Sequence, residues 1–141
     1  MKLLPKLAIV MIAFGMTNAM AVTSSSTIPL DDGAVLPGNS FSLMTDKLYP
    51  FHDYTITCTI RNTNRSADEK SEISLWREHM TFNAYVDDEL IEKGTGQVAH
   101  FNSKGATLKI DRANKGESIE IRNLDYTDTF SIEDCKAYLN N

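Results

Sequence analysis

The chain has 141 residues, a formal net charge of −5 at pH 7, two cysteines and three histidines. This length suits a single domain with one hydrophobic core, and the acidic balance disfavours nucleic acid and anionic lipid as partners. So few cysteines and histidines disfavour a zinc site, and the sequence contains neither a phosphate-binding glycine loop nor a G-x-S-x-G nucleophile motif.

The first 21 residues have the features of a secretory signal peptide. Lys2 and Lys6 give a positive start, residues 7–16 are apolar and uncharged, and Ala19-Met20-Ala21 places small residues where a signal peptidase reads. The alternatives are a membrane anchor or a buried N-terminal helix, but the apolar run is too short to span a bilayer. We therefore expect cleavage after residue 21 and a periplasmic or secreted protein, of a Gram-negative bacterium, with no stable membrane span.

Residues 22–39 are predicted to form a flexible or edge lead-in. The segment is rich in Ser and Thr and contains turn residues at 30–33 and 37–39. We expect one domain over residues 40–141, beginning with short strands at 40–44 and 47–49.

The clearest strand is predicted at residues 54–61. Tyr54, Ile56, Cys58 and Ile60 alternate with three threonines and Arg61, and this period of two indicates one face in the core and one in water. Cys58 therefore faces inward.

The two cysteines are predicted to form one disulfide. Cys135 is the only possible partner of Cys58, and an exported chain folds in an oxidising compartment. The loop closed would be more than half of the chain, which in the chain-entropy model stabilises by about 4 kcal/mol. The alternative, a redox or metal-binding pair, would need closer spacing or more soft ligands.

The remaining sequence continues the alternation between turns. Residues 62–72 are polar and predict a surface loop, and residues 82–91 predict a hairpin with an acidic tip. Residues 73–80 fit either a helix or a strand, and we favour a strand because strands surround them. Further strands are predicted at 98–101, 106–111, 119–122 and 130–132.

Cys135 lies one position out of phase with Phe130 and Ile132. A bulge or a strand end is therefore predicted just before it.

These elements predict an all-β antiparallel sandwich of about eight or nine short strands. A disulfide-tied sandwich with Trp76 after the first cysteine resembles immunoglobulin domains in architecture. The resemblance goes no further, because Glu133 stands where the tyrosine corner of that family requires Tyr, and few residues follow Cys135.

The function predicted is that of a non-enzymatic module that binds a protein or an envelope or extracellular partner through loops or a sheet face. Trp76, Tyr85 and Tyr126 are the candidate binding residues, because large amphipathic rings favour interfaces. For Trp76 the alternative is a core position. No cofactor is expected.

A second hypothesis is a small secreted hydrolase that uses His79 or His100 with nearby carboxylates. A histidine metal site is disfavoured, because His52, His79 and His100 lack the local spacing of metal ligands.

Two charged segments could bind a ligand, but an ordinary solvated surface is favoured for each. The acidic run of Asp87, Asp88, Glu89 and Glu92 could bind Ca²⁺, but it lacks the spacing of a calcium loop, and a soluble hairpin tip is favoured. Five basic residues could bind an anion or an acidic partner, but a solvated hairpin surface is favoured; they are Lys104, Lys109, Arg112, Lys115 and Arg122.

Overall fold

The computed structural model describes residues 27–65, 69–78, 83–87, 89–91 and 95–140. The predicted signal peptide and the start of the predicted lead-in lie outside these ranges. Every regular element within the ranges is a strand. A helix with the length and apolar composition needed to cross a membrane is not found among them.

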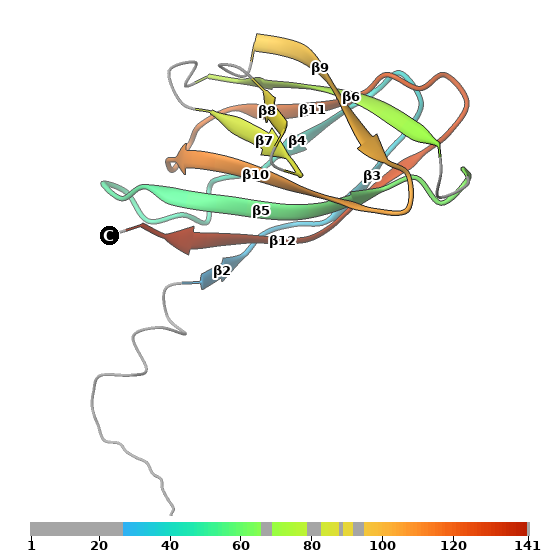
Figure 1. Cartoon of the computed structure of the whole chain (residues 1–141). Coiled ribbons are helices and arrows are strands. Elements are labelled where there is room, and N and C mark those ends of the chain that lie inside the picture. The colour runs from blue at the N-terminus through green and yellow to red at the C-terminus, as the bar shows by residue number, and fades with distance from the viewer. Residues whose placement is uncertain (1–26, 66–68, 79–82, 88, 92–94, 141) are drawn as a thin grey trace, which may run out of the picture.

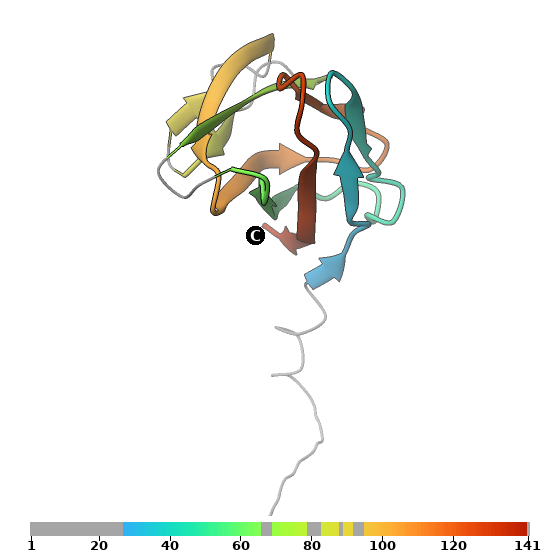
Figure 2. The same cartoon turned by 90° about the vertical axis from the view of Figure 1, so that its right-hand side faces the viewer.

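The strands form two antiparallel sheets that pack face to face (Figure 1). The seven-stranded sheet contains β2 (Thr27–Pro29), β3 (Gly33–Val35), β12 (Phe130–Leu139), β5 (Tyr54–Arg61), β10 (Ala106–Ala113), β7 (Ala84–Val86) and β8 (Glu89–Ile91). The four-stranded sheet contains β4 (Ser40–Leu43), β11 (Ile119–Asn123), β6 (Lys70–Arg77) and β9 (Thr95–Asn102), in that order. The turned view in Figure 2 shows strands of both sheets on opposite sides of the interior.

The pairing joins strands from opposite ends of the chain. β2 and β3 both pair with β12, as the two halves of one edge strand would. Moving inward along the chain from both ends, β4 pairs with β11, β5 with β10 and β6 with β9. With the β7–β8 hairpin set aside, this is the strand order of a jelly roll.

The predicted antiparallel sandwich is confirmed, but the described residues form eleven strands and not the eight or nine predicted. The resemblance to immunoglobulin domains does not extend to strand order. In the immunoglobulin order the first two strands are neighbours in one sheet, whereas here β12 lies beside β2. The disulfide also differs, because it joins two neighbouring strands of one sheet, β5 and β12, and not two sheets.

The core lies between the sheets and follows the predicted alternation. The inward residues of β5 are all buried, and they meet buried residues of β10 and β12 along the same sheet. β6 is a strand, as favoured, and its inward residues are Ile73, Leu75 and Arg77, so Trp76 points outward. Residues 79–80, the end of this predicted strand, lie outside the described residues.

Two predictions need correction. Residues 47–49 form a turn and not a strand, because the Leu48 amide donates to the Thr45 carbonyl and the Leu48 side chain is anchored in the core. The predicted surface loop 62–72 is shorter than expected, because β6 begins at Lys70, and Asn62 and Ser71 are buried. Of the segment predicted to be flexible or an edge, residues Thr27 to Val35 form the strands β2 and β3 at the edge of the seven-stranded sheet, as the edge alternative stated.

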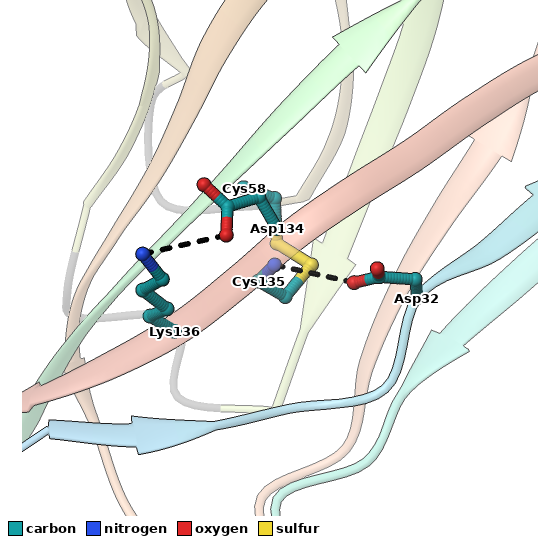
Figure 3. Close-up of a disulfide and its surroundings, with 5 residues drawn as sticks. All are labelled: Asp32, Cys58, Asp134, Cys135 and Lys136. Atoms are coloured by element: carbon teal, nitrogen blue, oxygen red, sulfur yellow. Dashed lines mark hydrogen bonds and ion pairs between the residues drawn. A yellow bond between two sulfur atoms is a disulfide. The ribbon is translucent and has the colours of Figure 1, made fainter.

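The bulge predicted before Cys135 is confirmed. The register of β12 against β5 shifts between Glu133 and Lys136, and Asp134 has φ 55°. The extra residue returns Cys135 to the buried face, where it bonds Cys58 with the two Cα atoms 4.1 Å apart. Figure 3 shows Asp32 at this bulge, where its carboxylate accepts a hydrogen bond from the Cys135 amide at 3.3 Å.

Candidate functional site

The three candidate binding residues lie on two sides of the sandwich. Trp76 is 43% exposed on β6 and Tyr126 is 89% exposed in the connection between β11 and β12. Tyr85 belongs to β7 of the other sheet, where the Lys109 ammonium lies 5.1 Å from the centre of its ring. Trp76 is therefore a surface residue and not a core residue.

Trp76 is part of the outer face of the four-stranded sheet, that is, the side chains of these strands that point away from the core. Glu120 of β11 pairs in register with Trp76, and Arg122 pairs with Ser74. These four residues line a surface hollow of about 430 Å³. The indole thus stands beside a carboxylate and a guanidinium, both of which can bind polar groups of a ligand.

Two further hollows continue from this one. The second, of about 310 Å³, is lined by Gly38, Glu72, Arg122, Asn123, Leu124 and Tyr126. The third, of about 300 Å³, is lined by Arg65, Lys70, Ser71, Glu72, Leu124, Asp125 and Tyr126. Arg122 lines the first and second hollows, and Glu72 and Tyr126 line the second and third. We call the three together the sheet groove, with Trp76 near one end and Arg65 near the other.

The far end of the sheet groove is built on an ion-pair cluster. Arg65 contacts the carboxylates of Asp125 and Asp128, and its Nε donates to Asp128 at 2.9 Å. The buried side chain of Asn62 donates to the same Asp128 oxygen at 3.0 Å. This cluster ties the β5–β6 loop to the β11–β12 connection.

The same contacts shift the pKa values of the two carboxyl groups in the cluster. Hydrogen bonds from Asn62 and Arg65 lower the pKa of Asp128. Burial raises the pKa of Asp125, but hydrogen bonds from Thr127 and the Asp128 amide, with the charge of Arg65, outweigh burial and leave this pKa below its usual value. Both carboxylates are therefore ionised at neutral pH.

The connection that carries Tyr126 is held by a second set of hydrogen bonds. The buried Asn123 amide donates to the carbonyls of Val35 and Asp128 at 2.9 and 2.8 Å, and its oxygen accepts from the Asp125 amide. Thr127 donates through its amide and its hydroxyl to Asp125. This bonding fixes the backbone around Tyr126, so the ring is presented on an ordered loop at low entropic cost to a ligand.

The histidines are only partly placed by the structure. His100 Nε2 lies 3.0 Å from a Glu72 oxygen, and about half of each side chain is exposed. His52 is exposed, and His79 lies outside the described residues. Among the described residues, His100 has no hydrogen bond to a serine, threonine or cysteine that could act as a nucleophile.

The acidic hairpin exists, but its tip is only partly described. β7 and β8 pair antiparallel, and Asp87 accepts a hydrogen bond from the Thr107 amide at 2.8 Å. Asp88 and Glu92 lie outside the described residues. In the part of the chain that the structure covers, no group of three or more His, Cys, Asp or Glu residues is placed to hold a metal ion.

The five basic residues predicted as one segment are spread over the molecule. Lys109 lies on the outer face of the seven-stranded sheet, and Arg122 lies on that of the four-stranded sheet. Arg112 pairs with Asp53 at 3.3 Å, in a strand bulge. They form no single anion patch.

A buried ion pair was missed by sequence reasoning. Arg77 and Glu117 have side chains with 0% exposure, and the guanidinium donates to both carboxylate oxygens at 2.7 and 2.9 Å. Arg77 also donates to the carbonyls of Asn83, Asp111 and Arg112. The available signal was the alternation of β6, in which Arg77 is in phase with Ile73 and Leu75. Because both charges are sealed from solvent, the pair is structural.

Comparisons with known proteins give no relative from which a function could be carried over: no family model, no curated protein and no solved structure matches the chain. The geometry of the chain itself therefore carries the functional argument.

Proposed function

We propose that this protein is a non-enzymatic binding module that works outside the cytoplasm and binds a protein or an envelope or extracellular partner through the outer face of its four-stranded sheet. The periplasm of a Gram-negative bacterium, or the medium, is the proposed location. A leader with the features of a signal peptide and a buried disulfide support export, because disulfides persist in oxidising compartments.

The observation that carries the proposal is the exposure of Trp76. Tryptophan is one of the three residue types enriched at binding hot spots, and a strand of a paired sheet holds it more rigidly than a loop would. Its neighbours Glu120 and Arg122 give the surrounding hollow polar groups of both charges, which suits a specific interface more than nonspecific adhesion.

The experiment is recovery of the partner from the native compartment with the full chain as bait. Trp76→Ala should abolish capture, whereas Tyr85→Ala, a matched aromatic truncation on the opposite sheet, should retain it. Circular dichroism and a thiol assay would establish that both variants fold with the disulfide intact. Capture that survives Trp76→Ala would refute this face as the binding surface, and loss with Tyr85→Ala alone would move the surface to the other sheet.

The pair of His100 and Glu72 supports a second candidate, a hydrolase. A histidine oriented by a carboxylate is one part of a general-base site, and Glu72 lines the sheet groove. Turnover of an ester or glycoside panel that disappears in His100→Ala would favour this candidate. Turnover unaffected by His100→Ala would exclude this pair as its site.

A further inference from the structure

The shape of the sheet groove calls for a long and narrow ligand. Trp76 and Lys70 are six residues apart on β6, so the groove follows this strand for about 20 Å at about 3.3 Å per residue. An exposed aromatic side chain lies toward each end, Trp76 in the first hollow and Tyr126 between the second and third. A ligand that contacts both rings must therefore extend over the first hollow and one of the other two.

The charges along the sheet groove balance. Its lining contributes three carboxylates and three cationic side chains, namely Glu72, Glu120, Asp125, Arg65, Lys70 and Arg122. Arg65 is in addition paired with Asp125. Because no net charge is offered and the whole chain is acidic, a polyanion such as a nucleic acid is a poor match.

An extended peptide is also a poor match. Peptides that lie along sheets add to a free strand edge, where unpaired backbone groups supply the hydrogen bonds. The sheet groove runs over β11 and β6, and each of these strands is already paired on both sides. A peptide here would find side chains but no backbone ladder.

A neutral chain of sugar rings matches the length of the sheet groove, its balanced charge and its lack of free backbone groups. The apolar C–H face of a sugar ring packs on an indole or phenol ring. Its neighbouring hydroxyls both donate and accept, so they suit carboxylates and guanidinium groups in alternation. Along the groove from Trp76 toward Tyr126 the charged side chains follow this alternating order, with Glu120 beside Trp76, then Arg122, then Glu72.

We propose that the sheet groove binds a neutral, linear oligosaccharide whose rings contact both Trp76 and Tyr126. This inference rests on the proposed function and specifies the class of ligand for the same face.

The test uses the only tryptophan of the chain as its reporter. The full-length mature protein is titrated with chitohexaose, cellohexaose and maltohexaose, and with the disaccharide of each series, while Trp76 emission is recorded. At least one hexasaccharide should change the emission saturably and bind about tenfold or more tighter than its disaccharide. Raising NaCl from about 50 to about 200 mM should leave the affinity nearly unchanged, because no phosphate-like charges are neutralised.

Calorimetry with the responding hexasaccharide then tests the two rings. Trp76→Ala and Tyr126→Ala should each weaken binding about tenfold or more, and Tyr85→Ala should leave it unchanged. Absence of binding by all three hexasaccharides, or binding that neither groove variant weakens, would overturn the inference. If saccharides fail while Trp76→Ala still abolishes partner capture, only the ligand class is wrong; if Trp76→Ala affects neither, the proposed binding face is wrong as well.

Discussion

Neutralising Glu117 tests how much the fold depends on its buried ion pair. Glu117→Gln keeps the shape of the side chain but leaves the Arg77 guanidinium, with 0% exposure, facing a neutral amide. The amide oxygen can accept one of the two hydrogen bonds that the carboxylate accepts now. Breaking a buried pair by removing one partner costs about 3–5 kcal/mol, because the remaining charge is uncompensated. We expect the free energy of unfolding to fall by that amount.

Arg77→Met should cost at least as much. The guanidinium also donates to three part-buried carbonyls, those of Asn83, Asp111 and Arg112. The Asn83 carbonyl would keep the Asp111 amide as a donor, but the other two would lose the guanidinium, and a buried acceptor that loses its donor costs about 1–3 kcal/mol. For the same reason, the double variant Arg77→Met/Glu117→Leu should not recover wild-type stability, although apolar replacement of a buried pair is often neutral.

Urea denaturation measures these effects. With a slope of about 2 kcal/mol per molar urea, a loss of about 4 kcal/mol lowers the midpoint by about 2 M. The control is Asp31→Asn, which removes an exposed ion pair with Lys47 and should change stability by less than about 1 kcal/mol. A Glu117→Gln midpoint as close to wild type as that of Asp31→Asn would refute the reasoning.

Three further predictions concern the disulfide, the ion-pair cluster and a glycine. Replacing Cys58 and Cys135 together by Ala should lower the free energy of unfolding by about 4 kcal/mol, since the bond spans a sequence separation of 77; a change below about 1 kcal/mol in urea unfolding would contradict it. The pKa of Asp128 is lowered in the folded state. The contribution of its ionised carboxylate to the stability of the fold is therefore complete above the unfolded pKa of about 4 and is lost as the pH falls through the folded value. The stability difference between wild type and Asp128→Asn, from urea midpoints, should therefore be largest near neutral pH and shrink below about pH 4, and a difference that grows on acidification would have the wrong sign. Gly33→Ala should cost about 1–3 kcal/mol, because the added Cβ would lie 2.5 Å from the Phe41 ring, and thermal melting should show a smaller cost in a Phe41→Leu background.

The predicted strands were recovered wherever the period of two was unbroken. β5 has the limits that the alternation from Tyr54 to Arg61 predicts. The bulge was predicted because Cys135 lies one position out of phase with the inward residues before it. In both cases the information is local, because the side chains of a strand alternate whatever its partners are. The prediction failed at residues 47–49, where the anchoring of Leu48 in the core outweighs local strand preference.

The candidate site was predicted only residue by residue. Trp76 and Tyr126 were candidates because of their residue types. The local sequence does not show that Arg122 and Glu72 connect them in one groove. Tyr85 had equal standing in the sequence and lies on the other sheet. The burial of the Arg77 charge likewise depends on Glu117, which comes 40 positions later.

The sequence by itself determined that this is an all-β chain with an inward-facing cysteine on its most regular strand, and it predicted the partner of that cysteine, because alternation and the cysteine count are properties of the chain alone. Only the tertiary structure decided that β12 lies beside β2 and β5 in a jelly-roll order, and that Trp76 faces outward into a groove. The physical reason is that strand pairing is made by backbone groups common to all residues, so the choice of neighbours emerges only when the whole set of apolar faces is buried at once.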